Sequence, residues 1–446
     1  MDAPARMHRD CVVVACPDAR PPAYQAVVGL ARAGMLKRFV TSYYHDPDGA
    51  VARIARALAP AAYDRRRGFL ARRHDVEIPA DRVASLPSVD LALKLESRVG
   101  GRSPGLRRAA GKARTHWFDR RLAGILAASR PGALLAFSDV ASGFAMPWCR
   151  RLGIPVVLSM VHGDVREEAR VLEVERAAAP EFFPLYLGDS SLDRAEMAWL
   201  HARRLRDLER ADLILAPSRH IADVLEREGV GRERVRVIPY AADCRRFRPP
   251  SRPRPEDGSC TFLFAGGVSQ RKGIKYLLEA WAKVRRPGWR LQLLGPMPRR
   301  LGPLEGMLEG VEPLGRVGHP EMPAHMASAD VFVFPSLFEG SAVVTYEALA
   351  CGLPCVVTPE AGSVVRDGIE GLIVPSRDID SLARAMARLG EDPALRARMS
   401  AAARGRAQDY DWPRYHMAVT DAVAGLLAER AIRPRGARPA ATTARG

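Results

Sequence analysis

The chain has 446 residues, of which 47% are hydrophobic, and a formal net charge of +17. This length and composition exclude a disordered chain and predict two or three domains with cores of their own. No apolar run approaches the ~18 residues of a membrane-spanning helix, and the run CVVVA at residues 11–15 is too short for the core of a signal peptide. We therefore expect a cytoplasmic protein.

The seven cysteines are odd in number and scattered, with no C-x-x-C pair. This pattern indicates reduced thiols and argues against a disulfide framework or a zinc site. We expect no metal and no cofactor.

The positive charge is concentrated in one part of the chain. Arginine supplies 62 of the 68 basic residues, which indicates a coding bias, but residues 51–150 still carry 19 basic against 8 acidic residues. Such a surplus can attract anionic lipid headgroups, a phosphorylated acceptor or nucleic acid, and a solvated arginine-rich surface explains it equally well. No aromatic-interleaved motif accompanies the charge, so no nucleic-acid partner is expected, while peripheral contact with the cytoplasmic face of an anionic membrane stays open. The arginines concerned include Arg65, Arg66, Arg67, Arg72, Arg73, Arg107 and Arg108.

The first part of the chain has the pattern of an α/β domain. Residues 11–15 and 36–42 have the length and apolar character of strands, and a helix is expected between them at 24–33. Residues 1–10 are expected to be disordered. Residues 45–112 show no clear periodicity, which favours a variable region, an insertion or a small helical subdomain.

A regular alternation of helix and strand follows, as in a parallel sheet. The expected elements are helices at 113–129, 141–152, 191–210 and 218–228, and strands at 133–137, 155–160, 213–216 and 235–238. His162 stands beside Gly163 just past the end of one of these strands. That is a position for a cleft, and a structural histidine is an equally good interpretation. Four acids form a patch that we expect on a solvated helix face, with paired catalytic carboxylates as the alternative: Glu167, Glu168, Glu173 and Glu175.

A Pro-rich, charged stretch at 248–258 cannot continue a sheet, and we interpret it as a linker. It separates a first domain at 1–247 from a second at 259–411. A helix at 412–430 is expected to cross back to the first domain, and 431–446 is expected to be a disordered tail.

The second domain opens with the strand TFLFA and a turn at Gly266 and Gly267, and Arg271 and Lys272 follow just before a helix. A guanidinium can hold phosphate oxygens through two N–H groups, and an ammonium adds a point charge near the positive end of the helix. The turn therefore indicates a phosphate site. It is not a Walker motif, because the spacing and the final Ser/Thr are absent. The apolar residues that we expect in the core are Ile274, Leu277, Leu278, Trp281 and Val284.

The stretch at residues 331–358, VFVFPSLFEGSAVVTYEALACGLPCVVT, is predicted to form a strand, a loop, a helix, a turn and a strand, with Ser341 as the expected helix cap. Such a unit places both strand ends on one sheet edge, where open α/β sheets bind ligands. Glu339 lies on that edge and Glu347 lies inside the helix. Two acids around a helix N-terminus indicate a site for a polyol attached to a phosphate. The residues that follow Glu339 are Gly340, Ser341, Ala342 and Val343.

The two glutamates, separated by seven residues within PS-x-x-EG and EA-x-A-x-G-x-P-x-V, resemble the signature of the retaining GT-B glycosyltransferases called family four or group 1. The resemblance implies an α/β fold of two Rossmann-like parallel-sheet domains that face each other across a cleft. It also implies that Glu339 lies over the donor sugar and that Glu347 holds the ribose of a sugar nucleotide. Residues 340–343 would lie beside that sugar. Family members usually have an aromatic residue and a glycine where this chain has Ser341 and Ala342, which bears on the identity of the sugar.

The resemblance further implies that the turn at Gly266 and Gly267 and the Arg271–Lys272 pair bind the donor diphosphate. Lys272 matches the family pattern, whereas Gly267 stands where the family has an arginine, and we expect Arg271 to substitute for it. For His162 the resemblance implies a catalytic position in contact with donor sugar or acceptor. Fixed positive charge at the diphosphate predicts transfer without a metal.

We therefore expect a retaining, metal-independent hexosyltransferase that moves a sugar from a nucleotide-diphosphate sugar to a glycan, lipid-linked or small-molecule acceptor, as in polysaccharide or glycolipid biosynthesis. Other classes stay open, and one of them is a nucleic-acid-binding protein, which the charge alone would suggest. A nucleotide-sugar epimerase of the same architecture would act without an acceptor, and a phosphorylase would need a lysine-held pyridoxal cofactor, for which there is no signal. A catalytically silent sugar-nucleotide-binding protein would keep Glu347 and Lys272.

Overall fold

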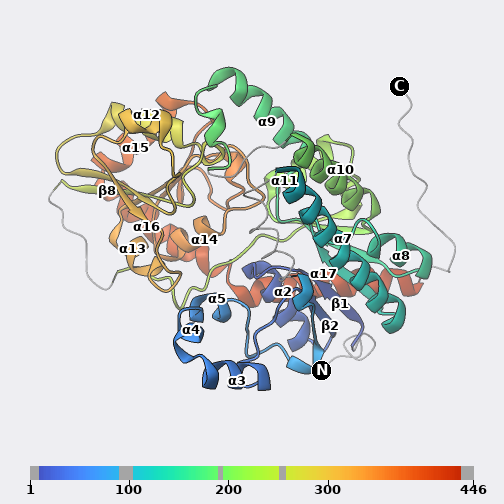
Figure 1. The fold of residues 1–446 in the computed structure, drawn as a ribbon. Helices are drawn as coiled ribbons and strands as arrows, with labels where there is room; N and C mark the ends of the chain where they lie inside the picture. Colours follow the sequence, from blue (N-terminus) through green and yellow to red (C-terminus); the bar gives the residue numbers. More distant parts are fainter. Residues whose placement is uncertain (1–9, 90–103, 189–193, 251–257, 433–446) are drawn as a thin grey trace, which may run out of the picture.

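The computed structural model describes residues 10–89, 104–188, 194–250 and 258–432. Within them the chain forms two α/β domains, each built on one parallel sheet with helices packed around it (Figure 1). The first sheet has the strand order β3-β2-β1-β4-β5-β6-β7, and the second has the order β10-β9-β8-β11-β12-β13. The predicted fold class of two Rossmann-like parallel-sheet domains is confirmed.

Short apolar strands form the first sheet. They are β1 (Val12–Ala15), β2 (Leu36–Thr41), β3 (Val83–Ser85), β4 (Ala133–Phe137), β5 (Val156–Ser159), β6 (Leu213–Ala216) and β7 (Val235–Val237). β1, β4, β5 and β6 are buried along their whole length, as expected of parallel strands that helices cover on both faces. The strand order reverses between β1 and β4, and the carboxyl ends of the strands at such a point are where open α/β sheets bind ligands.

The second sheet repeats this arrangement. Its strands are β8 (Cys260–Ala265), β9 (Trp289–Leu294), β10 (Val311–Gly315), β11 (Val331–Phe334), β12 (Cys355–Val357) and β13 (Gly371–Ile373). Here the order reverses between β8 and β11. The loops that follow these two strands carry Arg271 and Glu339, so the topology brings the two predicted site segments to one edge. Helix α12 (Ile274–Val284) buries all five of the apolar residues predicted to lie in the core.

The helices of the first domain are α2 (Pro21–Arg32), α3 (Ala50–Leu58), α4 (Pro60–Asp64), α5 (Arg67–Ala71), α7 (Pro104–Ser129), α8 (Ala145–Leu152), α9 (Val165–Ala178), α10 (Arg194–Arg210) and α11 (Arg219–Arg227). Two of them start earlier than predicted. α2 begins at Pro21 because proline has a helical φ and needs no N–H partner in the first turn. α7 extends from Pro104, nine residues before the start expected at residue 113.

The second domain contributes α13 (Met322–Ser328), α14 (Val343–Ala350), α15 (Ile379–Glu391), α16 (Pro393–Gln408) and α17 (Trp412–Ile432). α17 returns to the first domain and packs along α2. The packing is so close that a Cβ at Gly29 would lie 2.9 Å from His416 Cα. The Tyr415 hydroxyl donates a hydrogen bond of 3.2 Å to the Pro22 carbonyl, and His416 Nε2 lies 2.7 Å from the Gln25 side-chain oxygen.

Several predicted segments fall partly outside the described residues. The region 45–112, expected to be a variable region, an insertion or a small helical subdomain, contains α3, α4, α5 and β3, but residues 90–103 lie outside the description. The expected tail at 433–446, the linker residues 251–257 and residues 1–9 also lie outside it. Among the helices in the described ranges, none combines the length and the apolarity that crossing a bilayer requires.

Helix α8 begins at Ala145, four residues later than predicted, because a buried carboxylate sets its start. Asp119 of α7 accepts hydrogen bonds from the backbone N–H groups of Gly143 at 2.7 Å and Ala145 at 2.8 Å. Its charge is balanced by the Arg203 guanidinium of α10 at 3.0 Å, and both side chains are at most 1% exposed. Arg203 also donates to the Asp139 carbonyl at 3.1 Å. This pair therefore holds three helices and the loop after β4 in place.

We predict that Arg203→Met lowers the free energy of unfolding by about 3–5 kcal/mol, because it leaves the buried Asp119 carboxylate without its cation. Urea unfolding followed by circular dichroism measures this loss. Arg194→Met, on the exposed start of the same helix, should change stability by less than about 0.5 kcal/mol. Equal losses in the two variants would show that the buried pair has no special role.

Candidate active site

The loop between β11 and α14 places the Glu339 carboxylate among cations from another loop. Arg271 and Lys272 lie on the short 3-10 helix η4 (Gln270–Lys272), between β8 and α12. One oxygen of Glu339, Oε1, accepts from Arg271 Nη1 at 3.1 Å, from Lys272 Nζ and from Ser336 Oγ at 3.3 Å. Arg271 and Lys272 from one loop and Glu339 from another, which were predicted as parts of two separate motifs, thus form one cluster.

The electrostatics of this cluster keep Glu339 ionised. Burial acts to raise the pKa of Glu339, but Lys272 and Arg271 hold it below its usual value. Burial lowers the pKa of Lys272 to about 8. The nearby positive charge of Arg271 lowers it further, whereas the negative charge of Glu339 acts to raise it. The Lys272 ammonium also lies 4.9 Å from the centre of the Phe334 ring. The site therefore combines a fixed anion with a lysine whose charge is lost at mildly alkaline pH.

The Gly266–Gly267 turn lies at the end of β8, beside the end of β9. The Gly266 N–H donates to the Leu294 carbonyl at 2.8 Å. A Cβ at Gly295, the residue after β9, would lie only 2.0 Å from the Gly266 oxygen. At Gly267 a Cβ would meet nothing closer than Pro296 at 3.8 Å, so crowding at the Cβ position does not explain why glycine stands there.

Glu347 faces a different partner, which the sequence analysis did not identify. It is 8% exposed, and its Oε1 lies 3.4 Å from His319 Nε2. His319 follows β10, and its ring stands edge-on to Phe247 with the centroids 5.9 Å apart. The signal that could have identified His319 is its position after the last residue of a strand at the same sheet edge.

Ser341 is not the helix cap that the sequence predicted. α14 begins at Val343 with Ala342 as its N-cap residue, and no side chain caps it. The Ser341 hydroxyl instead donates to the Gly362 carbonyl at 2.7 Å and lies 2.9 Å from the Tyr346 hydroxyl. The Ser341 hydroxyl is therefore used in a tertiary contact with the loop after β12 and not in a local helix cap.

On the first domain, His162 lies at the end of β5 beside a charged pair. Its Nε2 is 3.4 Å from Asp139 Oδ2, and Arg204 of α10 donates to both oxygens of Asp139 at 2.9 and 3.1 Å. Burial acts to raise the pKa of Asp139, but His162 and Arg204 hold it well below its usual value. Burial lowers the pKa of His162, and Asp139 only partly offsets this. His162 was expected from the sequence, but neither its partner Asp139 nor Arg204, which pairs with Asp139, was.

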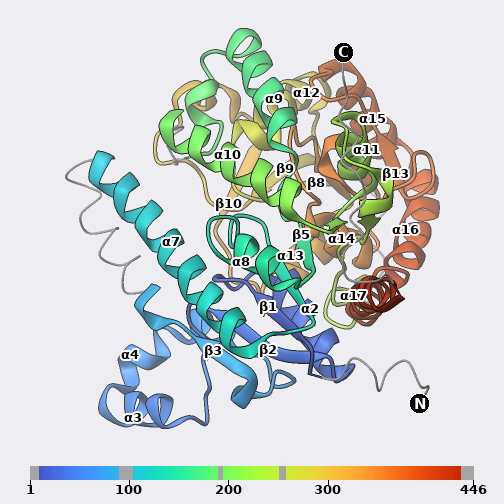
Figure 2. The ribbon, with the colours of Figure 1, turned by 90° about the vertical axis from the view of Figure 1, so that its right-hand side faces the viewer.

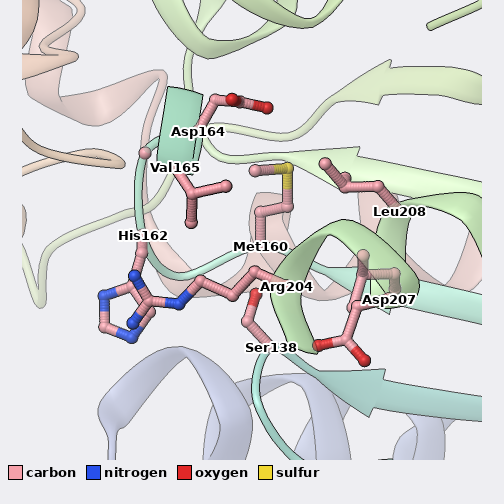
Figure 3. Close-up of a pocket in the computed structure, with 10 residues that line it drawn as sticks. Ser138, Met160, His162, Asp164, Val165, Arg204, Asp207 and Leu208 are labelled. Atoms are coloured by element: carbon pink, nitrogen blue, oxygen red, sulfur yellow. The ribbon is translucent and has the colours of Figure 1, made fainter. Parts of the chain in front are cut away.

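A small cavity lies behind His162, at the carboxyl ends of β4 and β5 (Figure 3). Its lining residues include Ser138, Met160, His162, Asp164, Val165, Arg204, Asp207 and Leu208. Burial raises the pKa of Asp207 to about 7. One oxygen of Asp207 accepts the Asp139 N–H at 2.9 Å, and the other has no hydrogen-bond partner within the described residues.

The two halves of the site touch directly through glycines. A Cβ at Gly163 would lie 2.4 Å from the Phe338 ring, and a Cβ at Gly340 would lie 3.0 Å from the Val161 oxygen. Only the absence of a side chain allows the strand end with His162 to reach the loop with Glu339. The Ser218 hydroxyl adds a hydrogen bond of 2.8 Å to the Gly340 carbonyl. The structure thus brings the His162 and Glu339 segments to one interface.

The acidic patch of α9 lies only partly in solvent, where the whole patch was predicted: Glu173 is exposed, but Glu168 is 5% exposed and Glu175 is fully buried. Glu175 accepts hydrogen bonds from Gln270 at 2.5 Å, from Tyr276 at 3.0 Å and from Arg377 at 2.7 Å. All three donors belong to the second domain. A small apolar cluster joins the same two surfaces, and its buried members are Val171, Tyr186, Tyr276, Leu337 and Phe338. The side of α9 that bears Glu175 is therefore covered by the other domain, which a single sequence cannot reveal.

Two Rossmann-like domains with a charged site where they meet define the GT-B class of protein. Two family models match the chain, "Glycosyltransferase Family 4" over residues 59–246 and "Glycosyl transferases group 1" over residues 259–392. Because both describe the same class and together cover most of the sequence, the chain belongs to the GT-B glycosyltransferases of group 1 and family 4.

The chain is similar to several curated proteins of this class. It is 33% identical to the D-inositol 3-phosphate glycosyltransferase of Pseudarthrobacter chlorophenolicus, over 49% of this chain and 58% of that protein. It is 30% identical to the glycogen synthase of Mycobacterium tuberculosis, over 48% and 54%. It is 27% identical to the MMP alpha-(1->4)-mannosyltransferase of Mycolicibacterium hassiacum, over 68% and 73%. The chain thus spans little more than half the length of the first two relatives.

Solved structures share the fold over nearly the whole chain. The sucrose-phosphate synthase of Thermosynechococcus elongatus has a TM-score of 0.60 at 19% identity, with 94% of this chain and 99% of that one covered. Anabaena HepE in complex with UDP-glucose has a TM-score of 0.55 at 16% identity, with 93% and 99% covered.

We predict that Glu175→Ala loosens the contact between the domains. It leaves the buried Gln270 and Tyr276 donors without an acceptor, at about 1–3 kcal/mol for each. Hydrogen exchange followed by mass spectrometry should show faster exchange in both α9 and residues 270–276. Glu173→Ala, on the exposed face of the same helix, should leave both segments protected. Unchanged exchange in Glu175→Ala would contradict a role for this carboxylate in holding the domains together.

Proposed function

We propose that the protein is a retaining glycosyltransferase that moves a sugar from a nucleotide-diphosphate sugar to a hydroxyl acceptor. The observation that carries the proposal is the cluster of Glu339, Arg271 and Lys272 at the end of the second sheet, next to the segment that holds His162. A carboxylate and two cations between domains suit a ligand that carries hydroxyl groups next to phosphates. The names of the relatives, which include a glycogen synthase and a mannosyltransferase, support sugar transfer.

In this proposal the diphosphate of the donor binds Arg271 and Lys272 beside the Gly266–Gly267 turn. The negative charge that develops on the departing nucleotide is then met by fixed positive charge, and transfer needs neither a metal nor another cofactor. The phosphate oxygens compete with Glu339 for the two cations. Glu339 is thereby freed toward the sugar that lies next to the phosphates. UDP and UDP-glucose, which HepE binds, are the donor fragments to test first.

The carboxylates take separate roles. Glu339, held ionised in the free protein, orients the donor sugar and stabilises the positive charge on its ring during transfer. Glu347, paired with His319, accepts hydrogen bonds from the ribose hydroxyls. The backbone at Gly340, Ser341, Ala342 and Val343 lies between them.

The first domain supplies the acceptor side. His162, oriented by Asp139, contacts the acceptor or the transferred sugar, and the acceptor hydroxyl attacks from the face of the leaving group, so that the anomeric configuration is retained. We infer a hexosyl donor and a glycan, lipid-linked or small-molecule acceptor, in the cytoplasm. Once a donor is known, proton NMR of the sugar first released by hydrolysis tests retention through its anomeric configuration.

The donor site is tested by thermal unfolding with UDP, GDP, ADP, TDP and CDP in the presence of EDTA. We predict that one of them raises the unfolding midpoint of the wild type, since a ligand at a hundred times its dissociation constant adds ~2.7 kcal/mol. Glu347→Ala should lose most of that response, because it removes the ribose acceptor.

Glu309→Ala is the matched control, since this carboxylate is 79% exposed and pairs only with Arg285 among the described residues. It should keep the full response. A panel in which no nucleotide stabilises the wild type, or in which Glu347→Ala responds like the control, would overturn the assignment of the donor site.

We also predict that nucleotide affinity depends on pH through Lys272. With a pKa of about 8, Lys272 is mostly charged below pH 8 and loses its proton above it. Because a bound diphosphate favours the charged form of Lys272, nucleotide binding above pH 8 requires Lys272 to take up a proton. The affinity for the stabilising nucleotide should be constant up to about pH 8 and then fall by up to about tenfold per pH unit. Isothermal titration calorimetry measures it.

Lys272→Arg keeps its charge throughout this range, because the arginine pKa lies above ~12. Its affinity should be flat where that of the wild type falls. A parallel decline in both proteins would assign the pH dependence to another group.

A further inference from the structure

Three short helices of the first domain, α3, α4 and α5, form an arm that stands out from the body of the protein. We call residues 50–73 the arm. Figures 1 and 2 show it at the periphery in both views, to the left of the sheet of the first domain. Of the residues in α3, only Ala52 is buried. The arm therefore adds almost nothing to the core.

The arm exposes large apolar side chains that are more often buried in a folded protein. Val51 is 77% exposed, Ile54 57% and Leu58 82%. Their spacing of three and four residues places them on one face of α3. Phe69 of α5 is 51% exposed. An aligned apolar face of this kind marks a surface that is covered by something else.

The same arm is strongly basic. It contains seven arginines and one acid, Asp64, which gives a net charge of +6. Within the described part of the chain, no carboxylate forms an ion pair with any of these arginines, which are Arg53, Arg56, Arg65, Arg66, Arg67, Arg72 and Arg73. Six of the seven are exposed and Arg73 is half-buried, so most of this charge is available to an external anionic partner.

We propose that the arm docks on the surface of an anionic lipid bilayer. An amphipathic helix with an apolar face and a basic remainder lies in the membrane interface, with its apolar side chains among the acyl chains and its cations at the headgroup phosphates. Val51, Ile54 and Leu58 supply the apolar face, and the arginines supply the cations.

The combination of features favours a bilayer over other occupants. A nucleic acid would account for the arginines but not for three aligned apolar side chains. A second copy of the arm would place seven arginines opposite seven arginines, and the like charges would repel each other. A bilayer surface satisfies the apolar and the charged groups together.

The arm is tied to the carboxyl edge of the first sheet, through the loop that follows β2. The His45 N–H, in the loop after β2, donates to the Arg73 carbonyl at 2.8 Å, and His45 Nε2 lies 2.9 Å from the Tyr63 hydroxyl. Docking therefore fixes the ligand-binding edge of the first domain relative to the membrane. Bilayer binding does not depend on sugar transfer, so the two proposals can fail separately.

The test is co-sedimentation of the full chain with vesicles of phosphatidylcholine alone and of phosphatidylcholine with about 30% phosphatidylglycerol. We expect binding to the anionic vesicles and little to the neutral ones, with weakening as salt rises. The apolar variant Val51→Gln/Ile54→Gln/Leu58→Gln and the basic variant Arg65→Gln/Arg66→Gln/Arg67→Gln should each lower the partition coefficient more than about tenfold. Both should keep the wild-type unfolding midpoint, because the altered residues are exposed.

The matched control is Val174→Gln/Ile369→Gln/Met417→Gln, which removes exposed apolar residues from elsewhere on the protein. It should bind like the wild type. An apolar variant that binds as well as the wild type would overturn the proposal, since it would show charge adsorption alone. Failure of the wild type to bind anionic vesicles would also overturn the proposal. So would an apolar variant that still binds the vesicles but no longer self-associates or no longer binds DNA, because the apolar face would then serve another partner.

Discussion

Glu339 stays charged inside the protein because Arg271 and Lys272, from a neighbouring loop, surround its carboxylate. An isolated charge at this depth would take up a proton. The pairing exists only because β8 and β11 are adjacent in the second sheet, so that the loops after them meet at one edge. The position of η4, the burial of Lys272 and its lowered pKa all follow from this geometry. The anion and the cations are thus a single unit, and a ligand that binds one of them must rearrange the others.

The first domain adds a second constraint, since it fixes how close the two sheets come. Glu175 of α9 is satisfied entirely by donors of the other domain, and glycines at 163 and 340 allow backbone to meet backbone. A buried carboxylate that depends on another domain favours the associated arrangement, because separation would have to hydrate all four groups. α17, which packs along α2, closes the same contact from the opposite end of the chain.

Much of the fold could be predicted from residue pattern. The apolar runs gave the position of most strands to within one residue, and spacing gave the buried face of α12. The predictions failed where a distant partner decides the outcome. α8 starts late because Asp119 of α7 caps it, and Ser341 binds Gly362 and Tyr346 instead of capping α14. His319, Asp139 and Arg204 were missed because neither a motif nor periodicity marks a residue that acts through its neighbour.

By itself, the sequence determined the class of fold, the family and the identity of the charged residues after β8 and β11, because hydrophobic periodicity and short motifs are local properties of the chain. Only the tertiary structure decided which of those charges meet. It showed that Glu175 is buried between domains whereas Glu173 is exposed, although both lie in one acidic helix. It also showed that residues 50–73, which carry seven arginines, expose large apolar side chains on α3. The reason is physical: burial and pairing depend on which surface covers a residue, and that surface is supplied by segments far away in the chain.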